Sequence, residues 1–350
     1  MEQNKKKVLG NALLFAAVFA LTVYAVFHGE DLHAMMAAIR DCDERWLIPA
    51  AVCVLAFIGG EAAILRLLLN SCGRKLRPGR CFLISSVGFF FSAVTPSAGG
   101  GQPAQVVFMR REKVPVAVSA VTLMAVTITY KLVLIVTGAG LALFGQDFLR
   151  EHMEGAMWLF WLGLGMAAAW IGLLLMLTFH PHMAKKILLW GLGLLERLHL
   201  MRSKPARRDK LLSSMEKYSE TAVYFRTHLG LMALVMVITA LQRFALFTVP
   251  WFVCRAFGLD ASRWFTVAVL QATIAISADM LPLPGGMGVS EGLFLRIFEP
   301  VFGEALVLPA MVLSRGVEFY CRLAFTAVLT LAASLVLGRP HKKRETEDPL

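Results

Sequence analysis

The chain has 350 residues, of which 57% are hydrophobic and 17% charged, and its mean hydropathy is +0.65. Soluble domains of this length do not carry such a composition, and several apolar runs approach or exceed the roughly 20 residues that cross a bilayer as a helix. The net charge of +11 is carried by Lys and Arg in loops between these runs, as the positive-inside rule produces. The sequence therefore predicts an all-α polytopic membrane protein without a nucleic-acid partner.

The first half of the chain contains apolar runs at about residues 8–27, 46–69, 116–144 and 156–179. Acidic loops follow the first and third runs, whereas a strongly basic loop follows the second, so we place the acidic loops outside and the basic loop in the cytoplasm. Residues 81–110 are apolar, are interrupted at 96–103 and have basic residues at both ends. This pattern predicts a re-entrant helical hairpin that enters from the cytoplasm.

Residues 180–228 form the one extended polar region, and its many Lys and Arg residues indicate a cytoplasmic location. Within it, apolar residues recur at helical spacing from Leu211 to Phe225. A helix of this kind lies along a membrane surface, with its basic residues near anionic headgroups. We therefore expect residues 180–228 to be an amphipathic linker between two membrane halves.

The second half has apolar runs at about 229–252 and 305–337, with a second broken apolar stretch at 264–298. The loop charges place this second hairpin on the external side. The predicted organisation is a first membrane repeat, 1–179, with hairpin 81–110; the linker, 180–228; a second membrane half, 229–338, with hairpin 264–298; and a cytoplasmic tail, 339–350. This gives about six to eight spans in an inverted repeat. The run 305–338 is either one long span or two shorter ones.

The two breaks can be aligned without a gap, because matching residues all lie 186 positions apart. The pairs are Pro96 and Pro282, Gly99 and Gly285, Gly100 and Gly286, and Gln105 and Glu291. Backbone that cannot be helical is costly in hydrocarbon because its N–H and C=O groups find no water. Two such breaks at corresponding places in two halves indicate a transport site. The half-helices after them direct free N–H groups at one point, which suits a phosphate or carboxylate. A kink held by neighbouring helices is the alternative.

Charged residues inside the spans each cost roughly 2.5–3.5 kcal/mol at mid-bilayer, so each should face a partner or a polar cavity. Cations there can hold a lipid phosphate, and carboxylates can receive a headgroup cation or a proton; for any one residue, structural ion pairing is the alternative. The candidate substrate-binding residues are Gly99, Gly100, Gln102, Gln105, Lys131, Arg243, Gly285, Gly286, Glu291, Arg315 and Glu318, with Glu61, Asp279 and Arg322 as secondary candidates. Six cysteines without a CxxC pair indicate neither a disulfide framework nor a zinc site, and we expect no metal or cofactor.

At the two breaks the chain resembles the flippase-like membrane region of lysylphosphatidylglycerol synthases, in the form of a stand-alone homologue without the synthase domain. Residues 281–291, Leu-Pro-Leu-Pro-Gly-Gly-Met-Gly-Val-Ser-Glu, fit that family's PGGxGxxE pattern. The first motif of the family usually reads TPxxxGGEPxR, and here Gln102 stands for its Glu and Gln105 for its Arg. The resemblance implies lipid translocation between leaflets through a cavity formed by two re-entrant hairpins, and no aminoacyl-transfer activity.

The sequence thus favours a lipid flippase of the cell membrane, with both termini cytoplasmic, that works by alternating access. Its expected partners are an anionic or aminoacylated phospholipid, or a polyprenyl-phosphate-type lipid, together with a separate lipid synthase; a homo-oligomer is compatible. Two alternatives are a membrane-embedded transferase that acts on a lipid-linked substrate and a non-transporting partner of an envelope lipid enzyme.

Overall fold

The computed structural model describes residues 32–95, 98–179, 220, 223–225, 227–259 and 264–337. The expected first span at 8–27, nearly all of the linker 180–228 and the tail 339–350 lie outside these residues. The described part of the chain is helical, without a strand. Its elements are α2 (Leu32–Asp41), η1 (Glu44–Trp46), α3 (Leu47–Ser71), α4 (Pro78–Val94), α5 (Gly101–Arg111), α6 (Val116–Phe144), α7 (Gln146–His152), α8 (Met157–Phe179), α11 (Leu229–Phe247), α12 (Val249–Ala256), α13 (Trp264–Ala278), η3 (Pro284–Gly286), α14 (Val289–Phe302), α15 (Glu304–Arg315), the π-helical segment η4 (Gly316–Cys321) and α16 (Arg322–Val336).

Five helical stretches in the described residues are long and apolar enough to cross a membrane: Glu44–Ser71, Val116–Phe144, Met157–Met176, Leu229–Ala256 and Glu304–Val336. At 1.5 Å per residue each is at least about 30 Å long, which is the thickness of the hydrocarbon core. They coincide with the apolar runs of the sequence, so the chain is a multi-pass helical membrane protein. The stretch after residue 304 is one continuous helix with a π-helical turn at 316–321, which favours one long span there.

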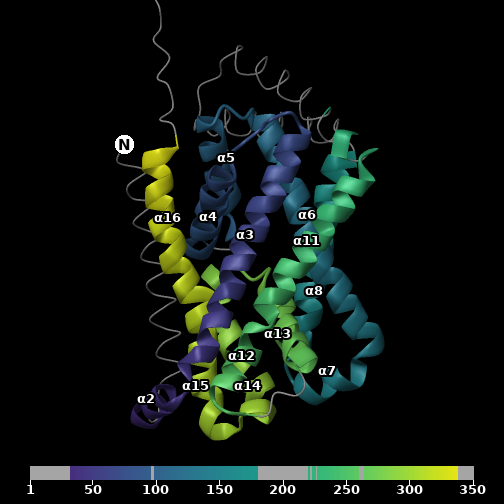
Figure 1. Cartoon of the computed structure of the whole chain (residues 1–350). Helices are drawn as coiled ribbons and strands as arrows, with labels where there is room; N and C mark the ends of the chain where they lie inside the picture. Colours follow the sequence, from purple (N-terminus) through teal and green to yellow (C-terminus); the bar gives the residue numbers. More distant parts are fainter. Residues whose placement is uncertain are drawn as a thin grey trace, which may run out of the picture.

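The two broken stretches each form a pair of shorter helices, α4 with α5 and α13 with α14. Pro78 begins α4, and Pro103 is the third residue of α5, where a missing N–H breaks no helical hydrogen bond. Figure 1 shows α4 and α5 in one half of the molecule and α13 and α14 in the other. The breaks meet between these halves, because η3 contacts α4, and Ala93 and Met287 belong to one buried cluster.

Two large apolar cores occupy the two halves of the molecule. One is built mainly from α13, α14 and α15 and also takes Leu134 of α6 and Phe160 of α8. The other is built mainly from α3, α4 and α6 and also takes Val235 of α11 and Ala333 of α16. Each core therefore combines residues from both halves of the sequence.

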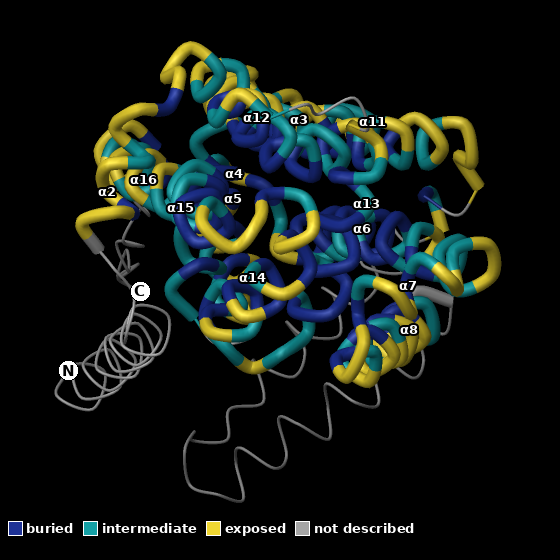
Figure 2. Tube along the Cα trace, turned by 90° about the horizontal axis from the view of Figure 1, so that it is seen from below, coloured by how far each residue is buried: buried dark blue, intermediate teal, exposed yellow. Residues whose placement is uncertain are grey.

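The outer surface of the bundle is apolar. Figure 2 shows exposed residues on the outer sides of α8 and α16, around an interior near α6 and α13 that is buried. Among the exposed side chains are Trp158, Trp161, Leu331 and Leu335. A soluble protein rarely exposes so extensive an apolar surface, whereas a bilayer covers it.

Candidate functional site

The first break is a tight turn that depends on small residues. The hydroxyl of Thr95 donates to the carbonyl of Phe91 at 2.6 Å and accepts from the N–H of Gly100 at 2.9 Å, so it bridges the end of α4 and the beginning of α5. A Cβ on Gly101 would collide with the side chain of Ser92 and approach the carbonyl of Gly88 to 2.7 Å. Glycine at 101 therefore lets α5 return in direct contact with α4.

The second break uses left-handed backbone at Gly285, Gly286 and Gly288, with φ of 61°, 67° and 84°. A Cβ on Gly285 would also collide with the ring of Phe319. Only glycine adopts this succession of positive φ angles without strain. The turn therefore brings Gly285 of η3 against Phe319 of η4.

A buried ion pair closes this second turn. The carboxylate of Glu291 accepts from the N–H of Gly288 and from Nε of Arg315, both at 2.8 Å. A second nitrogen of Arg315 donates to the carbonyl of Gly285 at 3.1 Å. One carboxylate thus caps α14 and also fixes the arginine of α15 that holds the turn.

A second ion pair joins α6 to the end of α13. Lys131 and Tyr130 both donate to the carboxylate of Asp279, and Lys131 is 6% exposed. Tyr130 also lies under Arg243 of α11, whose guanidinium carbon is 3.5 Å from the ring centroid. Asp279, which we expected only as a secondary residue, is therefore a central acceptor of the site.

Arg243 and Arg322 differ from the other two central cations, because neither forms an ion pair within the described part of the chain. Both lie over the ring of Phe57, at 4.9 Å and 5.4 Å from its centroid, and Arg322 also lies 6.0 Å from Phe89. Nε of Arg243 is buried and has no hydrogen-bond partner among the described residues. These two guanidiniums are therefore supported by aromatic rings and have no bonded carboxylate within the described residues.

Glu61 of α3 interacts with Arg243 and with the amides of Gln242 and Gln105. Two glycines make room for those amides, because a Cβ on Gly60 would collide with Gln242 and one on Gly88 with Gln105. Gln105 is thus part of the site. Gln102 is not: its amide donates to Thr127 on α6, and the residue is exposed, as is Gly99.

Glu318 lies in the π-helical segment and is 8% exposed. One of its carboxylate oxygens accepts from the amide nitrogen of Gln271 on α13 at 2.8 Å. The other oxygen of Glu318, and the amide oxygen of Gln271, are buried and have no partner among the described residues. Arg315 and Arg322, on the two sides of Glu318 in the same helical stretch, both face its carboxylate.

These groups form one connected polar cluster between the two apolar cores, which we call the central network. It contains four cations and four carboxylates: Lys131, Arg243, Arg315, Arg322, Glu61, Asp279, Glu291 and Glu318. Lys131, Arg243 and Glu318 each lie near the middle of a long helical stretch. Sequence reasoning overlooked Tyr130, Phe57 and Gln271, and the signal for Gln271 was a polar side chain within an apolar helix.

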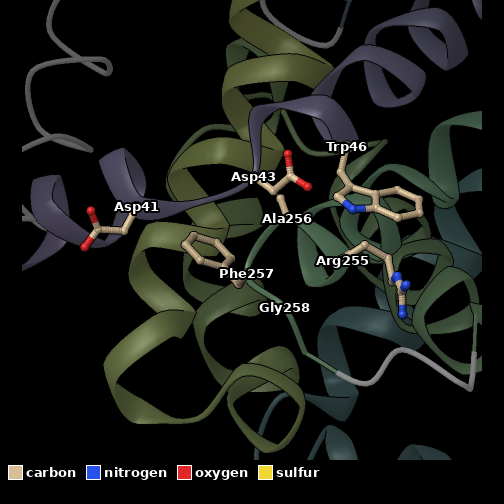
Figure 3. Close-up of a pocket in the computed structure, with 7 residues that line it drawn as sticks. All are labelled: Asp41, Asp43, Trp46, Arg255, Ala256, Phe257 and Gly258. Atoms are coloured by element: carbon tan, nitrogen blue, oxygen red, sulfur yellow. The ribbon is translucent and has the colours of Figure 1, made fainter.

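A separate pocket of about 430 Å³ lies at the ends of α3 and α12 and is lined by Asp41, Asp43, Trp46 and residues 255–258. In Figure 3 the carboxylate of Asp41 points away from Trp46 and Arg255, and Arg255 lies over the Trp46 ring at 4.9 Å. Burial and the neighbouring carboxylates raise the pKa of the adjacent Cys42 thiol. Trp46 is about 22 Å along α3 from Glu61, so the pocket is not part of the central network.

Within the described residues no group of His, Cys, Asp and Glu side chains is arranged to hold a metal ion. A family model described as "Lysylphosphatidylglycerol synthase TM region" matches residues 9–326 of the chain. A search of curated proteins returned no significant match.

Proposed function

Because the chain belongs to the family of the lysylphosphatidylglycerol synthase TM region, we propose that it is a lipid flippase of the cell membrane. It moves a phospholipid or a lipid-linked headgroup between leaflets by alternating access, with the helix pairs α4–α5 and α13–α14 as re-entrant hairpins from opposite sides. The observation that supports this best is the central network itself. Charges at the middle of long apolar helices are expensive, and they mark substrate pathways.

We assign the lipid phosphate to Arg243 and Arg322. Lys131 and Arg315 already have bonded carboxylates, Asp279 and Glu291, whereas the guanidiniums of Arg243 and Arg322 have none within the described residues. A planar guanidinium binds two phosphate oxygens at once, and its contacts strengthen when water is excluded. Glu61, beside Arg243, then receives a cationic part of the headgroup where the lipid has one.

The two ion pairs have a different role in this proposal. Glu291–Arg315 fixes the turn between α13 and α14, and Lys131–Asp279 fixes the end of α13 against α6. Alternating access requires parts of the molecule to move relative to one another around the bound headgroup. We expect α13 and α14 to move together with α6 and α15, to which these pairs attach them, so the pairs act on transport by positioning this hairpin.

The test is leaflet exchange of fluorescent phospholipids in liposomes that contain the purified protein. Arg243→Gln and Arg322→Gln should each slow exchange by at least about tenfold, since a charge-assisted hydrogen bond contributes roughly 1.5–3 kcal/mol. Arg150→Gln, at an exposed arginine of α7, is the matched control and should exchange at the rate of the unmodified protein. Product formation from labelled lipid without exchange would favour a transferase, and unchanged exchange in both variants would remove the two arginines from the mechanism.

A further inference from the structure

The contact between Glu318 and Gln271 has one hydrogen bond and lacks the donor for a second. An ionised carboxylate only accepts, so the amide N–H group of Gln271 can donate to it, but the amide oxygen of Gln271 receives no hydrogen bond in return. That bond is present, and the two remaining oxygens, one on each side chain, are buried without partners among the described residues. A proton on Glu318 would supply the donor that the amide oxygen of Gln271 lacks.

The net charge of the central network gives a reason why Glu318 would take up a proton when a lipid binds. With all eight groups ionised, the four cations and four carboxylates balance. A lipid phosphodiester brings one further negative charge, and an uncompensated charge in a site of low dielectric is strongly disfavoured. One proton taken up with the lipid restores neutrality.

We propose that Glu318 is a proton-binding site whose protonation is coupled to binding of an anionic phospholipid; this rests on the flippase function proposed above. A hydronium ion of the aqueous solution gives up the proton and becomes water, an O–H bond forms on the carboxylate oxygen that now lacks a partner, and the acid donates to the amide oxygen of Gln271. The carboxylate becomes a neutral acid, and the network as a whole changes by one charge. No other reactant is needed.

The surroundings of Glu318 explain why protonation of this residue and binding of the anionic phospholipid favour each other. Arg315 of α15 and Arg322 of α16 interact electrostatically with the carboxylate, while Gln271 of α13 is the neutral contact. Helix α3 also packs against η4. Its one carboxyl group is that of Glu61, which interacts with Arg243. A phosphate on Arg322 weakens the positive field at Glu318, so the anion promotes protonation and protonation promotes anion binding.

The experiment measures proton uptake when short-chain phosphatidylglycerol is added to the purified full-length protein in weakly buffered detergent. Linkage predicts uptake of about one proton per bound lipid, and an apparent affinity that falls by up to about tenfold per pH unit in the range where Glu318 is ionised before binding. Short-chain phosphatidylcholine, which is zwitterionic, should bind without proton uptake. Difference infrared spectra should show a protonated carboxyl signal only with phosphatidylglycerol.

The informative variant is Glu318→Gln, because its amide can both accept from and donate to Gln271. Proton uptake and the carboxyl signal should be lost, and phosphatidylglycerol affinity should become independent of pH. Glu112→Gln, at a carboxylate outside the network that pairs with Arg80, is the matched control and should behave as the unmodified protein.

Absence of proton uptake by the unmodified protein, equal uptake with phosphatidylcholine, or uptake that survives in Glu318→Gln would each overturn the inference. The flippase proposal is decided separately, by leaflet exchange. If lipids exchange between leaflets but phosphatidylglycerol binds without proton uptake, the flippase proposal is retained and the proton-binding site is rejected.

Discussion

The pair of Glu291 and Arg315 allows a sharp test of how the turn between α13 and α14 is held. Arg315 has an 11% exposed side chain and Glu291 a 4% exposed one. Removing one partner of a buried ion pair costs about 3–5 kcal/mol because the other charge stays buried. Glu291→Leu also removes the cap of α14, which is worth about 1 kcal/mol.

We therefore expect Glu291→Leu to lower the free energy of unfolding by about 4–6 kcal/mol and Arg315→Met by about 3–5 kcal/mol. The double variant leaves no buried charge unpaired and should be destabilised less than either single variant. The measurement is reversible unfolding in mixed detergent micelles, followed by circular dichroism for all four proteins of the cycle.

The pair of Arg80 and Glu112 provides the matched control, since the Arg80 side chain is 44% exposed. Solvent reaches the Arg80 side chain, although that of Glu112 is 4% exposed, so the coupling energy of this pair should be smaller, about 0.2–1 kcal/mol. If the costs at Glu291 and Arg315 add to within about 0.5 kcal/mol, the two side chains are not coupled, and the argument that this pair fixes the turn is wrong.

Other substitutions test the packing and the separate pocket near Trp46. A Cβ on Gly163 of α8 would collide with the backbone of Ile276, so Gly163→Ala should lower stability by about 1–3 kcal/mol; Gly165→Ala, with nothing within 4 Å, should be neutral or slightly stabilising in the same unfolding measurement. Gly285→Ala should cost at least about 1–2 kcal/mol from its positive φ alone, more because of Phe319, and should slow leaflet exchange; exchange at the normal rate would contradict the role of this turn. Because its pKa is raised, Cys42 should react with maleimide more slowly than a free thiol at neutral pH and gain reactivity only at more alkaline pH. Replacing Asp43 with Asn should speed that reaction, and a rate unaffected by this change would show that the charge of Asp43 does not protect the thiol.

The spans and breaks could be predicted because they depend on local properties of the chain. Runs of apolar residues long enough for a bilayer are visible directly, and the run 116–144 matches α6 from its first residue to its last. The glycines at 285, 286 and 288 lie where the backbone needs positive φ. Each of these features is determined by residues close together in sequence.

The partners within the site could not be predicted, because they depend on how distant helices pack. Lys131 and Asp279 are separated by 148 positions, and nothing local to either residue indicates the other. Lys131 and Arg315 were expected to hold phosphate, and each instead has a bonded carboxylate, whereas Arg322 was a secondary candidate and is unpaired within the described residues. Gln102 was a candidate like Gln105, which follows it by three residues on α5, but it is exposed and its amide bonds to Thr127 of α6.

The way α16 packs has a consequence for biogenesis. This last described helix lies along α4, where Ala333 and Leu337 join the apolar core with Ile84 and Val87, and Phe325 contacts the ring of Phe82. A ribosome releases α4 more than 200 residues before it releases α16. The α4–α5 helix pair is therefore made long before the helix that covers α4. Two co-expressed fragments should form a stable protein when the second fragment includes α16 and should fail to do so when it ends before Arg322.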